Sequence, residues 1–246
     1  MIRAFRCDLH IHTCLSPCAG LDMYPNALVG RAVAEKLDVI AICDHNASEN
    51  VPHVIRAARG HELVVLPGME ITSREEVHLL ALFDRMDSLQ RLQDIVYSHL
   101  PGENDEKRFG CQAIVNELDE VEGFNERLLI GATQMALADL VRLIHNFGGL
   151  TVASHIDRQS FSVISQLGFV DPEIPFDALE ISERIGLASA RRKYPELAGY
   201  PFLTSSDAHR CEEIGKGFTE FFLEEPSVHE LQMAFSGQRG RRMAGF

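Results

Sequence analysis

The chain has 246 residues, of which 46% are hydrophobic and 24% are charged, values typical of a soluble globular protein with a sizeable core. The length suits one large domain over residues 1–246 better than two domains. The formal net charge of −13 disfavours binding of long duplex nucleic acid. The longest apolar runs are strand-sized and the N-terminus carries no signal-peptide pattern, so we expect no membrane span and a cytoplasmic location. In that compartment the six cysteines are expected to be thiols or ligands rather than disulfides.

Short apolar runs alternate with helix-like segments along the chain. In chain order we expect strand 4–12, helix 24–37, strand 37–45, helix 51–60, strands 62–71 and 75–83, helix 86–100, helix 135–149, strands 150–155, 176–182, 200–209 and 217–224, and helix 227–236. Strands separated by helices indicate βα units with parallel strands, and continuous apolar strands indicate a sheet covered on both faces. The pattern predicts an α/β barrel.

Residues 100–135 interrupt this rhythm, because they are polar and acidic and contain no clear strand. We interpret them as an insertion over the barrel that is helical around residues 112–121. The basic, glycine-containing tail after Ser236 is expected to be a frayed terminus.

Histidines and carboxylates gather at the predicted strand ends. The set is His10, His12, His45, Glu70, His78, His155, Asp207 and His209. Because the carboxyl ends of parallel strands share one face in α/β folds, these side chains are expected to converge there. Each has a purely structural alternative: His78 as a satisfied core histidine, or Asp207 as a helix cap. Together they would be costly to bury without partners, and divalent Zn, Mn or Fe would supply partners for imidazole and carboxylate.

The motifs "DLHIHT", "CDHN", "ASH" and "SDAH", with "PGMEIT" and "EVHLL" between them, resemble the PHP (polymerase and histidinol phosphatase) family. The resemblance runs from about Phe5 to His209 and is closest to the stand-alone metal-dependent phosphoesterases. It implies a distorted seven-stranded (β/α) TIM-like barrel with a trinuclear metal site holding two to three divalent ions.

The resemblance also implies an assignment of ligands. One metal would take His10, His12, Glu70 and Asp207, a second would share Glu70 and take His78 and His155, and a third would take His45 and His209. The remaining ligand of the third site falls at Pro17 or Cys18. We hypothesise that the Cys18 thiolate completes it, which would favour Zn or Fe over Mg. The alternative is an apolar thiol, with Asp22 or water as the ligand. Asp8 is a candidate to hold one imidazole in place, because strand alternation puts it on the side of His10 and His12.

Clustered divalent ions suit hydrolysis of phosphate esters by a metal-bridging hydroxide. Glu70 would bridge the first two metals and Asp207 would bind the first, and the leaving group would be protonated by metal-bound water, His209 or Asp44. Arg158 and Arg210 lie beside expected ligands and are candidates to bind the substrate phosphate. A surface salt bridge is the alternative for each, and Arg158 is the stronger candidate of the two.

The expected function is hydrolysis of a small phosphorylated substrate, a phosphomonoester with nucleotides included, by a monomer or weak dimer. Alternatives are an exonuclease-like phosphodiesterase acting on oligonucleotide ends, a histidinol-phosphate phosphatase, a metal hydrolase of C–N or C–O bonds, and a non-catalytic metal-sensing scaffold.

Overall fold

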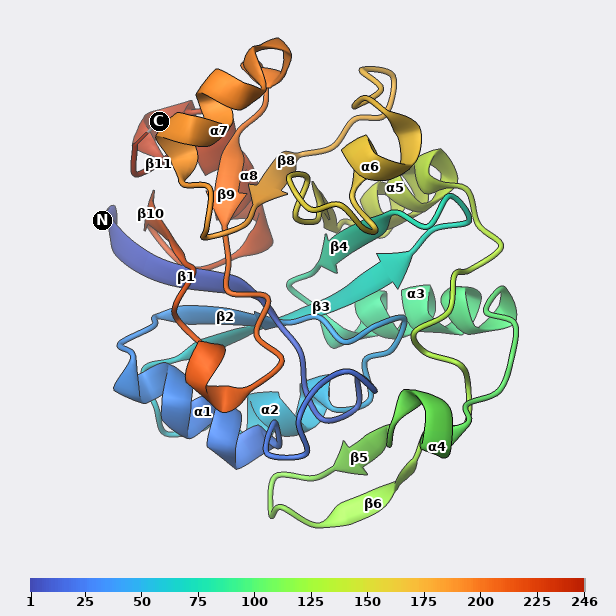
Figure 1. Cartoon of the computed structure of the whole chain (residues 1–246). Helices are drawn as coiled ribbons and strands as arrows, with labels where there is room; N and C mark the ends of the chain where they lie inside the picture. The colour runs from blue at the N-terminus through green and yellow to red at the C-terminus, as the bar shows by residue number, and fades with distance from the viewer. Residues whose placement is uncertain (246) are drawn as a thin grey trace.

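A curled nine-stranded sheet organises the computed structural model, which describes residues 1–245 (Figure 1). Its strand order is β11-β10-β1-β2-β3-β4-β7-β8-β9. The strands are β1 (Arg3–Ile11), β2 (Val39–Ile42), β3 (Val64–Thr72), β4 (His78–Leu82), β7 (Leu150–Ala153), β8 (Ala178–Ile181), β9 (Phe202–Thr204), β10 (Thr219–Leu223) and β11 (Arg242–Met243).

Seven of these strands, from β1 to β9, lie side by side in chain order, as a βα barrel requires. The expected all-parallel arrangement is wrong at β4, which is antiparallel to both β3 and β7, and at β10, which is antiparallel to β1. β10 pairs with β1 from Arg3 to Cys7 and so occupies most of the edge that β9 would need. The chain after β9 meets β1 only through an isolated bridge between Ile11 and Ala208, so within residues 1–245 the sheet is a half-barrel rather than a closed TIM barrel.

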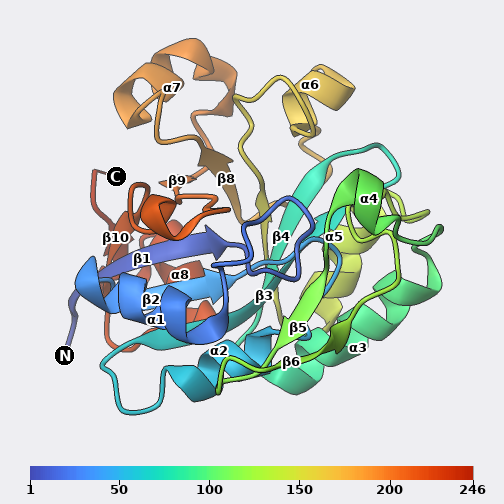
Figure 2. The same cartoon turned by 60° about the horizontal axis from the view of Figure 1, so that its bottom comes forward.

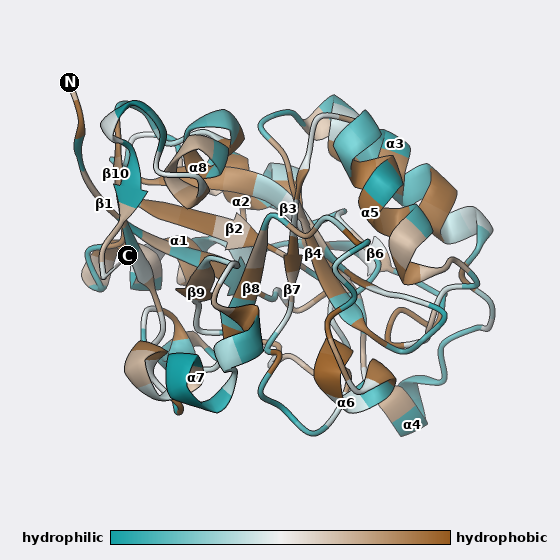
Figure 3. Ribbon diagram, turned by 90° about the horizontal axis from the view of Figure 1, so that it is seen from above, coloured by the Kyte–Doolittle hydropathy of each residue, from teal (hydrophilic) through white to brown (hydrophobic). Residues whose placement is uncertain are grey.

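Helices cover the sheet, mostly where the apolar pattern predicts them; the two within residues 163–193 were not expected. They are α1 (Pro25–Ala34), α2 (Val51–Ala57), α3 (Met86–Ser98), α5 (Leu137–Asn146), α6 (Val163–Leu167), α7 (Leu187–Lys193) and α8 (Val228–Phe235), with short 3-10 turns η1 (Pro195–Leu197), η2 (Cys211–Glu213) and η3 (Gln238–Gly240). Pro25 occupies the first turn of α1, where its missing N–H costs nothing. α3 buries Leu89, Leu92 and Val96, spaced as one helical face. Figure 3 shows apolar strands at the centre and hydrophilic stretches on the outward sides of α3 and α7.

The core lies on both faces of the sheet, because successive side chains of a strand point to opposite sides. Ile40 and Ile42 of β2 join the cluster beneath the outer helices, whereas Val39 and Ala41 join a second cluster that includes Leu231 of α8. α2 and α3 pack on β3, α5 on β7, and α8 on β10 and β11. The strands are therefore fixed from both sides, which leaves their carboxyl ends as a rigid frame for a site.

The insertion at 100–135 is not helical around 112–121 as expected. It contains a short α4 (Glu106–Phe109) and a hairpin of β5 (Ala113–Val115) and β6 (Val121–Phe124), which lies along α2 and α3 (Figure 2). The Asn116 side-chain oxygen accepts hydrogen bonds from the N–H groups of Leu118 and Glu120, at 2.9 and 3.0 Å, and so forms a turn where a helix would have continued.

The tail after Ser236 is also more ordered than expected. β11 pairs with β10, and the Arg241 guanidinium donates to both carboxylate oxygens of Glu230 and to Glu224. No helix within residues 1–245 is long and apolar enough to cross a membrane.

Candidate metal centre

The histidines and carboxylates singled out in the sequence meet at one end of the sheet. β1 delivers His10 near its carboxyl end, and β3 delivers Glu70. β4 runs the other way, so its first residue, His78, pairs with Thr72 at the carboxyl end of β3. Gly68 lets β3 approach β2 closely, because a Cβ there would lie 2.8 Å from the Cys43 sulfur.

Glu70 lies at the centre of the cluster and is 1% exposed. Its Oε1 is 3.1 Å from His78 Nδ1 and 3.4 Å from both His10 Nε2 and His155 Nε2. Its Oε2 is 3.0 Å from His45 Nδ1 and 3.6 Å from His12 Nε2. One carboxylate therefore faces five imidazoles from four separate chain segments.

Asp207 closes the cluster on the side of the β9 end. Its Oδ1 lies 3.2 Å from His10 Nε2 and 3.1 Å from His12 Nε2, and its Oδ2 contacts the Arg158 guanidinium. The backbone φ angles of Asp207 (49°) and His155 (29°) are positive, which is strained for residues other than glycine. Such strain is held where the surrounding structure requires one exact side-chain position.

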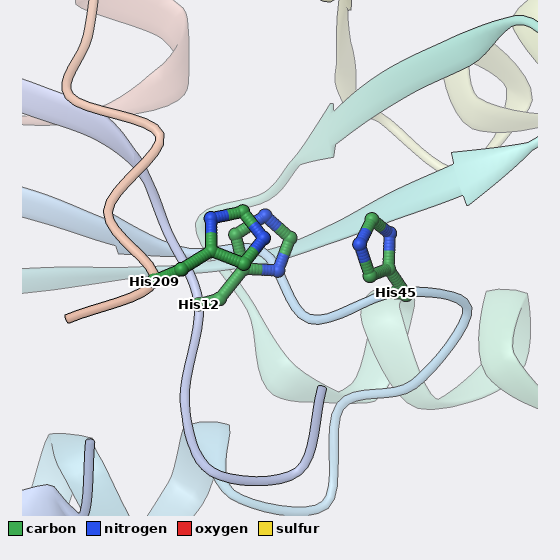
Figure 4. Close-up of side chains that lie close together, drawn as sticks. All are labelled: His12, His45 and His209. Atoms are coloured by element: carbon green, nitrogen blue, oxygen red, sulfur yellow. The ribbon is translucent and has the colours of Figure 1, made fainter. Parts of the chain in front are cut away.

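Three groups of side chains each bring their ligand atoms within 4.8 Å of one another. They are His10, His12 and Glu70; His45, Glu70 and His78; and His12, His45 and His209. Figure 4 shows the last group, whose imidazoles come from three different loops and reach the same space. The rings of His12 and His209 stack with centroids 4.2 Å apart.

Hydrogen bonds at the far nitrogens fix which imidazole atoms face the centre. His10 Nδ1 lies 3.0 Å from the carboxylate of Glu180, so that nitrogen is the donor and Nε2 keeps a lone pair. Ser16 Oγ donates its one proton to Asp44 at 2.7 Å, so His12 Nδ1, 3.0 Å away, must donate to Ser16. In the neutral imidazoles, the Nε2 atoms of His10 and His12 then face each other at 3.2 Å, with their lone pairs toward the centre.

Several other buried atoms of the cluster have no hydrogen-bond partner within residues 1–245. These are His155 Nδ1 and, despite separations of 3.0–3.1 Å that lack hydrogen-bond alignment, His45 Nδ1 opposite Glu70 Oε2 and His78 Nδ1 opposite Glu70 Oε1. Unpaired buried polar atoms are costly and rare, and a centre lined by acceptors alone calls for a cation. The donor set of imidazole and carboxylate suits Zn, Mn or Fe. The residues present therefore fit divalent metal ions.

Electrostatics keep both central carboxylates ionised. Burial alone would raise the pKa of Glu70, but His78 and His10 outweigh it and hold that pKa well below its usual value. Burial likewise opposes ionisation of Asp207, and His10 and His12 hold its pKa well below the usual range. Two anionic carboxylates at the strand ends are what a cation site needs.

Cys18 is exposed beside the same cluster. Desolvation of the sulfur favours the thiol, but hydrogen bonds with His209 and His45 outweigh it and lower the pKa of Cys18 to about 6. Cys18 therefore lies next to His45 and His209, the two histidines with which it is hypothesised to share a metal.

Glu180 of β8 is the supporting residue that the sequence reading missed. It is 1% exposed and accepts from His10 Nδ1 and from the His155 N–H, each at 3.0 Å. The available signal was a carboxylate inside the apolar run "FDALEIS".

Asp8, expected to hold an imidazole, instead accepts from the N–H groups of Ser206 and Gly215, at 2.9 and 3.0 Å. The β1–β2 register shifts between Asp8 and Ile11, so strict alternation does not carry Asp8 onto the face of His10.

Asp44 lies behind the cluster. Besides Ser16, its oxygens accept from the N–H and the hydroxyl of Thr13, each at 2.7 Å. Both oxygens are occupied and buried, so this arrangement supports a positioning role for Asp44 rather than proton donation to a substrate.

A cavity of about 1120 Å³ opens over the cluster. Its wall includes four cationic side chains, namely Arg158, Arg184, Lys193 and Lys216. Arg210 is exposed and is not among the described residues that line it. Of the two candidate phosphate-binding arginines, only Arg158 faces the cavity.

Comparison with known proteins shows the family whose model matches this chain. The model of the PHP domain matches residues 8–180, and that of a PHP-associated region matches residues 191–238. The uncharacterized protein YqxK of Bacillus subtilis (strain 168) is 30% identical over 110 residues, which are 43% of this chain and 28% of YqxK.

Two solved structures share the fold. The lesion-specific endonuclease PfuEndoQ from Pyrococcus furiosus superposes with a TM-score of 0.79 at 15% identity, over 98% of this chain and 58% of that one. A candidate metal-dependent phosphoesterase from Bifidobacterium adolescentis superposes with a TM-score of 0.54 at 19% identity, over 82% of this chain and 87% of that one. The chain thus spans less than a third of YqxK and little more than half of the endonuclease chain.

Proposed function

The chain belongs to the PHP family, and from this premise we propose that it is a metal-dependent phosphoesterase that hydrolyses a small phosphorylated substrate. The observation that carries the proposal is the acceptor-only centre, in which His10 Nε2, His12 Nε2 and two ionised carboxylates converge beneath an open cavity. Divalent ions bound there would supply Lewis acidity toward a phosphoryl oxygen and toward an attacking water.

Three groups of residues would hold two to three such ions, Zn, Mn or Fe. The first is His10, His12, Glu70 and Asp207; the second is Glu70, His78 and His155; the third is His45, His209 and Cys18. Glu70 would serve the first two together, which agrees with its contacts to imidazoles from both groups.

The chain's own groups would bind and orient the phosphate. Arg158 lines the cavity and reaches Asp207, so its guanidinium would bind a phosphoryl oxygen beside the centre. His209 lies at the cavity wall, with its Nδ1 held 2.9 Å from the Asp207 carbonyl oxygen. This bond leaves its Nε2 to bind an ion of the third group, so His209 would serve as a ligand rather than as a proton donor. Glu180 and Ser16 would keep His10 and His12 in the required tautomers.

A second candidate is a phosphodiesterase that acts on nucleic acid, either on oligonucleotide ends or within a strand. The favouring observation is a cavity wall that carries Arg158, Arg184, Lys193 and Lys216, along with Asp157, Glu183 and Glu213, in a chain whose net charge is −13. Such a wall would follow more than one phosphate. The fold shared with the endonuclease PfuEndoQ raises the same possibility.

The test is metal content by plasma mass spectrometry, combined with product release from phosphomonoesters, nucleoside monophosphates and short single-stranded oligonucleotides. We expect two to three equivalents of metal per chain and turnover that Asp207→Ala abolishes. Arg158→Ala should raise KM about tenfold, whereas Arg142→Ala, which removes an exposed arginine paired with Asp139 on α5, should not. No bound metal and no turnover after reloading with Mn or Zn would refute the proposal.

A further inference from the structure

An aromatic ring lies on the cavity wall next to the metal centre and has no role in holding metal. Phe161 belongs to the segment between β7 and α6, lines the cavity and is 38% exposed. Its ring stacks on His78 with centroids 4.6 Å apart and planes inclined by 15°. Its carbonyl oxygen accepts the His78 N–H at 2.9 Å. The ring is thus fixed to a residue that contacts Glu70.

The segment around Phe161 is strained and rigid. The φ of Phe161 is +56°, a conformation that a bulky side chain rarely adopts. Ser162 caps α6 by accepting from the Ser165 N–H, and its hydroxyl donates to the Arg158 carbonyl oxygen at 2.8 Å. These bonds hold the strained backbone. They also fix the spacing between the Phe161 ring and the Arg158 backbone.

We propose that Phe161, together with Ile130, is the wall on which a flat ring of the substrate stacks, so that the site selects phosphate esters of nucleosides. Ile130 lines the same cavity and is 36% exposed. Every nucleobase has a π-face that stacks on an aromatic side chain. This inference rests on the proposed function only in placing the phosphate at the metal centre beside Arg158.

A matched pair of substrates isolates the ring. Adenosine 5′-monophosphate and ribose 5-phosphate present the same phosphate on the same sugar and differ in the base. Phe161→Leu should raise KM for the nucleotide about tenfold, leave ribose 5-phosphate unchanged and spare kcat. Phe161→Tyr, which keeps the ring, should retain the preference. If Phe161 only supports His78, Phe161→Leu would impair both substrates equally and lower metal content, and the proposal would be wrong.

Binding can be followed without turnover, because the chain contains no tryptophan. Phe161→Trp introduces a single tryptophan, which can be excited selectively over the four tyrosines. We expect adenosine 5′-monophosphate to quench its fluorescence and ribose 5-phosphate to leave it unchanged. Phe169→Trp is the control, since Phe169 is 59% exposed and is not among the described residues that line the cavity.

A 5′-phosphorylated trinucleotide is the third ligand tested in the fluorescence titration. Quenching by the mononucleotide alone indicates a free nucleotide as substrate, and quenching by both indicates that strand ends also enter. Quenching by neither overturns the stacking proposal even if the protein hydrolyses phosphate esters. Quenching without hydrolysis would leave stacking intact and refute the phosphoesterase activity.

Discussion

His10 and His12 both use Nδ1 for a hydrogen bond that points away from the centre of the cluster. Glu180 and Ser16 accept hydrogen bonds from the Nδ1–H groups of His10 and His12, so the Nε2 atoms of both rings face Glu70 and Asp207. Without a cation this arrangement draws in a proton, and although burial opposes it, Asp207 and Glu180 raise the pKa of His10 well above its usual value. A divalent ion satisfies the same acceptors with more charge.

Glu180 should therefore be needed for metal affinity although it contacts no substrate. Glu180→Gln keeps the shape but removes the charge that holds the His10 N–H, and we expect metal affinity to fall about 10- to 100-fold. Titration of metal-free protein with Zn, followed by calorimetry, measures this. Glu183→Gln makes the same charge change at an exposed position on the same cavity wall and should leave affinity within about twofold. Equal effects of the two variants would exclude a specific role for Glu180.

Cys18 tests the composition of the third site. Its thiol faces His45 and His209, so Cys18→Ser should remove about one metal equivalent per chain and leave the others bound. Cys111→Ser, which changes a half-buried thiol of the insertion, is the matched control. Metal content by plasma mass spectrometry decides the question, and an unchanged stoichiometry in Cys18→Ser would assign that position to another ligand.

The sequence predicts most of the side chains of the cluster, because motif residues such as His12 and Asp207 lie at strand ends that the fold must bring together. It does not reveal Glu180, whose role depends on β8 lying beside β7. It misplaces Asp8, because a register shift inside a strand leaves no mark in an apolar run.

Among the elements, β4 and the β5–β6 hairpin depart most from the expected pattern. Only residues 73–77 join β3 to β4, and a parallel crossover needs a longer connection. The short distance in sequence between the two apolar runs therefore already indicates antiparallel pairing. The hairpin is harder to predict, because "QAIVNELDEV" has both helix-forming residues and a short β-branched run. Its turn is decided by hydrogen bonds of the Asn116 side chain.

Asn50 connects the hairpin to the site. Its side chain accepts from the Val115 N–H at 3.0 Å and donates to the Ala113 carbonyl oxygen at 3.0 Å and to Thr13 Oγ1 at 2.9 Å. Asn50→Ala leaves these buried groups unpaired and should cost about 3 kcal/mol of unfolding free energy. Urea denaturation measures the total, and amide exchange should show loss of protection at Val115 first. Asn26→Ala, at an exposed contact with the hairpin turn, is the control and should cost under about 1 kcal/mol.

Asp177 links α5 to β7 at the end of the sheet away from the metal centre. Burial opposes its ionisation, but His145 and the Thr151 N–H and hydroxyl outweigh it and lower its pKa. A carboxylate with a depressed native pKa stabilises the fold above its unfolded pKa of about 3.9, and this contribution is lost as the pH falls through the native value.

Asp177→Asn should therefore cost about 2 kcal/mol of unfolding free energy at pH 7 and progressively less below about pH 4. Thermal melts from pH 3 to pH 7 measure the difference. Asp87→Asn, in an exposed pair with Arg85, should follow the wild type throughout, and a constant penalty for Asp177→Asn would contradict the linkage.

Across the whole molecule, acidic residues outnumber basic ones, and the two carboxylates of the proposed metal centre are ionised. The chain carries 36 acidic against 23 basic residues, yet the cavity wall has four cationic side chains around a centre of ionised carboxylates. Bound divalent ions would reverse the local sign at the cavity floor. An anionic substrate could then enter a site that the formal charge alone would repel.

Metal ions should stabilise the entire fold, because the centre joins β1, β3, β4 and the loops after β2, β7 and β9. A ligand that binds only the native state at about 100 times its Kd adds about 2.7 kcal/mol. For a chain of this size we therefore expect the Tm to rise by about 5–10 °C on loading with Zn or Mn and to fall by the same amount in EDTA. Calorimetric melts of the metal-free and reloaded protein test this. Asp207→Ala should lose most of the shift, whereas Asp87→Asn should keep it. If the loaded and stripped proteins melt together while mass spectrometry finds metal bound, the ions are held at the surface rather than by the strand-end cluster.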